Sequence, residues 1–210
     1  MSKEHTVKQG ETMASIAHDF GFFSFDTLWN HPGNAELKKR RDNPLVLSPG
    51  DVVFIPDKTS KTVSAATNAA HVFVVKRAPL KVRFALLDLQ RSPLTKTKVT
   101  VFVDGAESSL TTDGDGNIEI AVKATTRQLK VVVRDEEIVL DVGHLDPVGK
   151  TTGLQARLLN LGYFHGEIGD ESNVDETNFA LRLFQADQDL DVTGEADEQT
   201  RAKLIAAHGS

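Results

Sequence analysis

The sequence offers few side chains that could carry catalysis. It contains no cysteine, which excludes a thiolate nucleophile and a thiolate-bound metal. It also lacks His-Glu-x-x-His, Gly-x-Ser-x-Gly and Walker-type patterns. A glycosidase needs two carboxyl groups across a cleft, whereas the central carboxylates are expected to sit in turns: Asp104, Glu107, Asp113, Asp115 and Glu119. We therefore expect a protein that is not an enzyme.

The central part of the chain, residues 71–143, is not expected to bind a metal or a cofactor. His71 and His144, at its two edges, are too few to supply a zinc ligand set. The segment Asp113–Asn117 has the acidic spacing of a calcium loop. However, Ile118 and Ala124 replace the glycine and the final glutamate that such a loop needs. A hairpin turn is the better interpretation of this segment.

Length and composition indicate several small folded modules. The chain has 210 residues, of which 40% are hydrophobic and 26% charged, a balance typical of folded proteins. No apolar run is long enough to span a membrane. Residues 1–12 contain no apolar leader segment, so we expect synthesis in the cytoplasm and, for any export to the periplasm or cell wall, a non-Sec route. Residues 144–210 hold 12 acidic against 5 basic residues, which argues against a nucleic-acid partner.

Residues 1–57 have the pattern of a small βααβ module. A short strand at His5–Val7 precedes Thr12, which is placed to cap a helix carrying Met13, Ile16, Ala17 and Phe20 on one face. A second helix is expected over Phe25–Asn30, and a strand over Val52–Ile55. Residues 58–70 have the composition of a linker.

Residues 71–146 are expected to form an all-β sandwich, and residues 147–210 a helical module. The β pattern consists of six short apolar or alternating runs: Val72–Val75, Lys81–Leu87, Lys98–Val103, Ile118–Val122, Leu129–Val133 and Ile138–Val142. The helical pattern comprises a helix around Leu154–Leu161, one capped by Thr177 and a third over Glu198–Ala207. No tandem repeat is evident. The fold class is thus a multi-domain α+β protein.

The N-terminal module resembles LysM domains. The resemblance rests on the segments HTVKQGETM (5–13), LWN (28–30) and LSPGDVVFIP (47–56), in the order and spacing of that family. LysM domains bind glycans containing N-acetylglucosamine in a shallow groove between two loops. The resemblance places that groove at Gly10, Glu11, Thr12, Met13, Asn30, His31, Pro32, Asn34, Pro49 and Gly50. The alternative is that these residues only build turns and a helix cap.

The module departs from the LysM pattern in an insert, Ala35–Val46. The insert carries four successive basic residues, Lys38, Lys39, Arg40 and Arg41, which could dock an acidic partner or merely end a solvated helix. The sole tryptophan, Trp29, is expected in the core rather than in a sugar platform.

The C-terminal module resembles the three-helix peptidoglycan-binding domains that accompany cell-wall hydrolases. The segments GLQARL (153–158), LGYF (161–164), ALRLFQ (180–185) and LDVTG (190–194) carry the resemblance. It implies a glycan groove at Tyr163, Phe164, Asp170, Phe184, Gln185, Asp191 and Gly194. The family's Asp-Gly in the first loop is Gly169-Asp170 here. A helical docking module without a glycan ligand is the alternative.

The central segment is similar, more weakly, to the transthyretin-like sandwiches of carboxypeptidase regulatory regions, through PL (93–94), VTV (99–101) and TDGDG (112–116).

The sequence therefore predicts a non-catalytic accessory or adaptor that binds peptidoglycan. It resembles LysM proteins of type VI secretion and other contractile injection systems, whose spike or effector proteins are candidate partners. The alternatives are a bridging component of a phage-like tail and a cytoplasmic chaperone or immunity-type protein without a glycan ligand.

Overall fold

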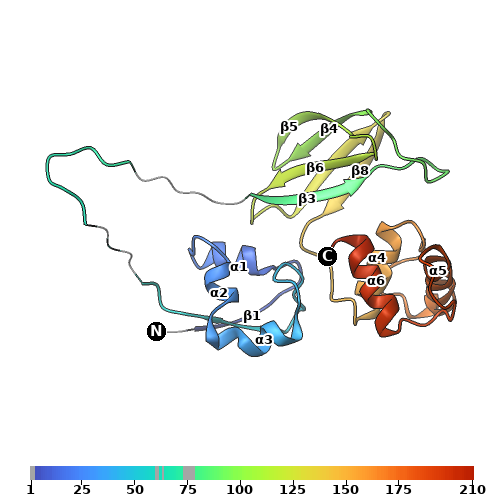
Figure 1. The fold of residues 1–210 in the computed structure, drawn as a ribbon, viewed down its shortest axis with the longest axis horizontal. Helices are drawn as coiled ribbons and strands as arrows, with labels where there is room; N and C mark the ends of the chain where they lie inside the picture. The colour runs from blue at the N-terminus through green and yellow to red at the C-terminus, as the bar shows by residue number, and fades with distance from the viewer. Residues whose placement is uncertain (1–2, 60–61, 63, 73–78) are drawn as a thin grey trace.

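The computed structural model describes residues 3–59, 62, 64–72 and 79–210. Within these residues the protein is a mixed α+β chain whose buried apolar side chains gather in three separate cores. We call the corresponding parts the N-terminal module (residues 3–57), the central β module (79–142) and the helical module (146–210). Figure 1 shows them as blue, green-to-yellow and orange-to-red parts of the ribbon.

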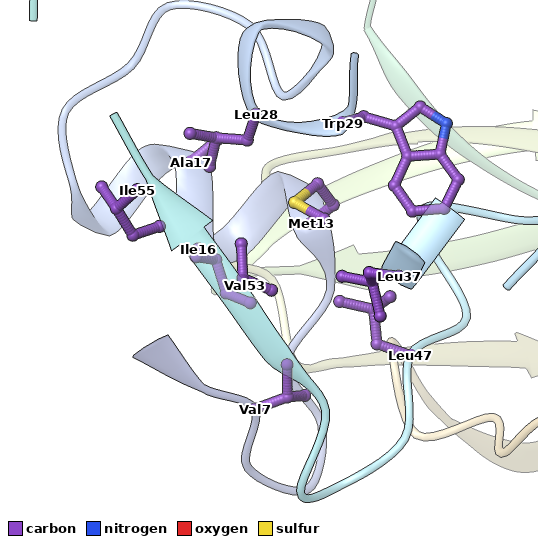
Figure 2. Packing of buried hydrophobic residues seen from close by; sticks show 10 residues of the cluster. All are labelled: Val7, Met13, Ile16, Ala17, Leu28, Trp29, Leu37, Leu47, Val53 and Ile55. Atoms are coloured by element: carbon purple, nitrogen blue, oxygen red, sulfur yellow. The ribbon is translucent and has the colours of Figure 1, made fainter. Parts of the chain in front are cut away.

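The N-terminal module pairs a two-stranded antiparallel sheet with short helices. Its elements are β1 (Lys3–Thr6), α1 (Met13–Asp19), α2 (Asp26–Trp29), η1 (Pro32–Asn34), α3 (Ala35–Arg40) and β2 (Val52–Ile55). The register sets His5 opposite Val53. Helices and β2 contribute the core, in which Met13, Leu28 and Val53 are fully buried (Figure 2).

The start of α1 confirms the expected cap. The backbone N–H of Thr12 donates to Ser15 Oγ at 2.9 Å, and the Ser15 N–H donates to Thr12 Oγ1 at 3.2 Å. This reciprocal pair satisfies two backbone donors that the first turn leaves without helical partners. Gly21 follows the helix with φ +69°, a conformation that favours glycine.

Two features of this module differ in detail from the sequence expectation. The second helix is shorter than predicted, from Asp26 to Trp29, and the insert folds into a further helix, α3, whose Leu37 is buried. The expectation for Trp29 is confirmed, since its side chain lies in the core at 7% exposure (Figure 2).

The central β module consists of two sheets around one core. One sheet pairs β3 (Leu80–Ala85) with β6 (Asn117–Val122). The other has the order β5-β4-β7-β8, formed by β4 (Lys98–Val103), β5 (Ala106–Thr111), β7 (Gln128–Val133) and β8 (Glu136–Asp141). Ile118 and Ile120 of the first sheet share a core with Val99 and Val131 of the second.

The sequence pattern missed β5, because its residues are largely exposed and polar and therefore lack apolar alternation. The expected turn positions of two carboxylates were also wrong: Glu107 lies in β5 and Glu119 in β6. A turn at Asp113 is confirmed, with Asp113 Oδ1 accepting from the Asp115 and Asn117 N–H groups at 2.9 and 2.8 Å. It is not a hairpin, however, because it joins β5 to β6, which belong to different sheets. Of the predicted strand Val72–Val75, residues 73–75 lie outside the described residues.

The helical module contains α4 (Thr151–Asn160), η2 (Glu171–Asn173), α5 (Val174–Asp187) and α6 (Glu198–His208). Thr177 was expected to cap the second helix, but α5 begins three residues earlier and Thr177 is buried within it. The cap is replaced by a short 3₁₀ turn, in which Asp170 accepts from the Ser172 N–H at 2.8 Å. Among the described residues, no helix is both long and apolar enough to cross a bilayer.

Candidate functional site

The first loop predicted for a glycan groove is held by its own hydrogen bonds. Glu11 Oε2 accepts from the Lys8 N–H at 2.8 Å and lies 2.7 Å from His5 Nε2. Partial burial works to raise the pKa of Glu11, but the Lys8 N–H and His5 outweigh it and lower that pKa. Glu11 is therefore a carboxylate that closes a turn, and Thr12 beside it is the helix cap.

The same loop contacts the central β module. Arg127 Nη1 donates to the Gly10 carbonyl at 3.1 Å. A Cβ placed on Gly10 would lie 2.9 Å from His144 Nε2, and one on Gly143 would lie 3.0 Å from the Gly10 carbonyl oxygen. The chain that leaves the β module therefore covers Gly10, one edge of the groove that the sequence predicts.

The second predicted loop is built around the amide of Asn34, which is 1% exposed. Asn34 Nδ2 donates to the carbonyls of Leu28 and Phe54 at 2.8 and 2.9 Å, and Asn34 Oδ1 accepts from the Phe54 N–H at 2.7 Å. The His31 ring stacks on Phe54 with centroids 4.9 Å apart. These contacts join the loop to β2, so Asn34 supports the fold.

Of the other residues predicted for this groove, one is buried in the core and four are exposed. Met13 lies in the core with no exposed surface. Asn30, Pro32, Pro49 and Gly50 are exposed, and Asn30 Oδ1 accepts from Lys38 Nζ at 2.7 Å.

Of the four successive basic residues at the end of α3, one forms an ion pair within the module and three are exposed. Arg41 forms a two-point ion pair with Asp51, with Nε–Oδ2 at 2.8 Å and Nη2–Oδ1 at 3.0 Å. Burial tends to raise the pKa of Asp51, but Arg41 and the Ser48 N–H lower it overall. Lys38, Lys39 and Arg40 are exposed, whereas Arg41 is held by Asp51, so only three of the four predicted docking residues are free to form that surface.

The helical module contains one hydrogen-bond pattern twice, a repetition that was not evident in the sequence. Gln185 Oε1 accepts from the Gly194 N–H at 2.8 Å, and its Nε2 donates to Thr200 Oγ1 at 3.1 Å. Gln155 does the same with the Gly169 N–H at 2.8 Å and with Thr177 Oγ1 at 2.9 Å. Each glutamine thus joins a helix to the loop that follows it and to the next helix.

Most residues predicted for the C-terminal groove serve this framework. Phe164 and Phe184 are core residues at 1% and 0% exposure, and Gln185 is fully buried. Gly194 is buried with φ +78°. Asp170 and Asp191 are exposed, and the Ser172 N–H lowers the pKa of Asp170.

Tyr163 forms a contact between modules. Its ring packs edge-on against Phe184, and its hydroxyl donates to Asp187 Oδ2 at 3.0 Å. The guanidinium of Arg91, from the loop after β3, lies 4.3 Å from the ring centroid. Arg91 Nη1 is 3.5 Å from Asp187 Oδ2, and Arg91 Nη2 donates to the Leu161 carbonyl at 3.2 Å. Tyr163, predicted as a glycan contact, is thus buried at 8% exposure and lies beside a cation of the β module.

Sequence reasoning missed three residues that the structure brings to these surfaces. Arg91 and Arg127 reach across module boundaries, which no local pattern signals. Phe179 lies on α5 with 59% of its surface exposed, although an aromatic residue on an amphipathic helix usually faces the core. Phe179 and Leu183 form a second apolar line on the side of the helix opposite the buried Thr177, Leu181 and Phe184, so apolar spacing alone did not indicate which line faces the core.

The carboxylates of the β module are not gathered into a metal site. Among the described residues no group of three or more His, Asp or Glu side chains is placed to hold a metal ion. Glu119 instead pairs with Lys81 and Arg83 across the β3–β6 sheet, and Asp104 accepts from Thr126 Oγ1 at 3.0 Å.

Comparison with known proteins gives a family match over the helical module. Neither the curated proteins nor the solved structures contain a significant match to the chain. Residues 151–204, which run from the start of α4 into α6, match the family model described as a putative peptidoglycan binding domain.

Proposed function

We propose that this protein is a non-catalytic accessory protein that attaches to peptidoglycan through its helical module. The observation that carries the proposal is the family match over residues 151–204, which covers α4, α5, the first part of α6 and both glutamine networks. The fixed loops of this module suit a binding surface, because a preformed surface loses little conformational entropy on binding. A peptidoglycan ligand also requires the protein to reach the cell wall.

A sedimentation assay with purified sacculi tests this function. The full chain is expected to pellet with sacculi in excess over an unrelated acidic protein of similar size, and to saturate with increasing protein. Absence of retention above that control would refute the proposal. Release of soluble fragments from dye-labelled sacculi by the purified protein would refute its non-catalytic part.

A second role, as a protein-bridging adaptor of a contractile injection system, is supported by the N-terminal module. Its Gly10 loop already contacts Arg127 and the chain at Gly143, so this LysM-like surface takes part in a contact between protein modules. Lys38, Lys39 and Arg40 add a basic surface for an acidic partner. Co-purification with spike or effector proteins tests this role, and a triple Lys38/Lys39/Arg40→Ala variant is expected to weaken that capture.

A further inference from the structure

The outward side of α5 carries an apolar stripe that does not contribute to the core of the helical module. Phe179 and Leu183 are 59% and 42% exposed and lie one turn apart, so their side chains are neighbours on the helix surface. The next position along the same line is Asp187, which accepts the Tyr163 hydroxyl and pairs with Arg91. The line from Phe179 to Asp187 extends over about 12 Å at 1.5 Å per residue.

Two cations lie beside this stripe, Arg182 on the same helix and Arg91 at the Asp187 end, although the helical module as a whole is acidic. Arg182 is exposed on α5 and lies against Gly194, where an added Cβ would be 2.8 Å from Arg182 Nε. Arg91 is half-exposed and lies at the Asp187 end of the stripe, beside Tyr163. Its guanidinium has five N–H donors, and the contacts with Leu161 and Asp187 leave some of them for a ligand.

This combination fits the chemistry of peptidoglycan. An exposed aromatic ring can stack on the apolar face of a sugar, and an aliphatic neighbour extends that surface. The stem peptides of peptidoglycan carry carboxylates, which a guanidinium recognises with directional hydrogen bonds. Two carboxylates, Asp175 and Asp187, lie on the same line of α5 and would repel such an anionic polymer, so the arginines beside the stripe are needed to offset that repulsion.

We propose that peptidoglycan binds along this stripe, with a sugar ring on Phe179 and Leu183 and a stem-peptide carboxylate on Arg91. The inference rests on the proposed function and adds to it the place of binding. The proposed binding surface then contains residues of two modules, because Arg91 belongs to the central β module and Phe179 and Leu183 to the helical module. Attachment to the wall then depends on the β module remaining docked against the helical one.

The experiment uses the full chain, with intact sacculi and with glycan strands from which an amidase has removed the stem peptides. Phe179→Ala is expected to weaken binding to both polymers about fivefold to tenfold. Val174→Ala is the matched control, since Val174 lies on the same helix with 58% exposure but off the stripe. Arg91→Gln is expected to weaken binding to intact sacculi several-fold and to leave binding to peptide-free strands unchanged.

The outcomes separate the two proposals. If the unmodified protein is not retained by sacculi, the proposed function fails. If it is retained and Phe179→Ala binds as tightly as Val174→Ala, peptidoglycan binds elsewhere and the inference is overturned. An equal loss on both polymers for Arg91→Gln would show that Arg91 only holds the modules together. Urea unfolding monitored through Tyr163 verifies that each variant is folded.

Discussion

The buried amide of Gln185 offers a sharp test of how the helical module is held together. Its Oε1 accepts from the Gly194 N–H, and its Nε2 donates to the Glu195 carbonyl at 3.0 Å and to the hydroxyls of Thr193 and Thr200 at 3.1 Å. The side chain has no exposed surface. Gln185→Ala removes all of these partners at once and leaves a cavity.

The expected loss of stability follows from these contacts. A buried donor left without a partner costs about 1–3 kcal/mol, and the buried Gly194 N–H loses its partner; the part-buried contact with the Glu195 carbonyl is lost as well. With the cavity included, we expect Gln185→Ala to cost about 3–5 kcal/mol. A module of this size has a total stability of roughly 3–9 kcal/mol. Gln155→Ala should cost less, about 2–3 kcal/mol, because Thr177 keeps its bond to the Asn173 carbonyl.

The chain carries its own optical probes for this measurement. Its single Tyr, Tyr163, lies in the core of the helical module, and its single Trp, Trp29, lies in the core of the N-terminal module. Urea unfolding followed by tryptophan fluorescence reports the N-terminal module. Near-ultraviolet absorbance of the same variants in a Trp29→Phe background reports Tyr163 and the helical module. Gln185→Ala is expected to lower the tyrosine midpoint by about 2 M urea or more.

The matched control is Gln188→Ala, at the end of the same helix, which should leave the tyrosine midpoint within experimental error. A change below about 0.5 kcal/mol for Gln185→Ala would refute the role assigned to the amide network. An equal shift of the tryptophan transition would instead refute independent unfolding of the modules.

Three further predictions concern pH, capping and the basic run. Burial, and then the charge of Arg157, lower the pKa of His208 from 6.5 to about 4. Because the unfolded chain takes up this proton near pH 6.5 and the folded chain resists it, the helical module should lose about 1 kcal/mol between pH 7 and pH 5. His208→Asn should abolish most of that loss in the tyrosine-monitored unfolding. Thr12→Ala removes the α1 cap and should lower the tryptophan-monitored stability by about 1 kcal/mol, whereas Thr12→Ser should retain it; equal values for the two variants would contradict the capping role. Arg41→Ala leaves the buried Asp51 carboxylate unpaired and should cost about 2–3 kcal/mol in the same assay. Lys39→Ala, at an exposed ion pair, should have no measurable effect, and similar losses for both variants would refute the division of the basic run into structural and surface residues.

Contacts between modules change how the predicted binding surfaces can work. Gly10 and Tyr163 were predicted as ligand contacts in separate modules, and each is approached by an arginine of the central β module. The β module is therefore more than a spacer: Arg127 covers one surface, while Arg91 adds donors to the other. A ligand that contacts the Gly10 loop must displace the contact with Arg127 or bind beside it.

Local sequence patterns determined many of the elements of this protein. The cap at Thr12, the strand at Lys98–Val103 and the third helix near Glu198 follow from polar caps and from apolar spacing within a few residues. Such signals involve neighbours in the chain, so they can be read from the sequence. The edge strand β5 was missed because an exposed strand does not need apolar alternation.

Tertiary packing decided which side chains of the candidate site reach solvent. Phe179 and Phe184 occupy the same helix and are both aromatic, yet the first is 59% exposed and the second fully buried. The face of α5 that turns inward is set by α4 and α6, which the helix sequence does not contain. The bond from Arg127 to Gly10 joins residues 117 positions apart. The sequence determined the elements because their signals are local, and the fold alone decided the accessible surface because that surface depends on how distant modules pack.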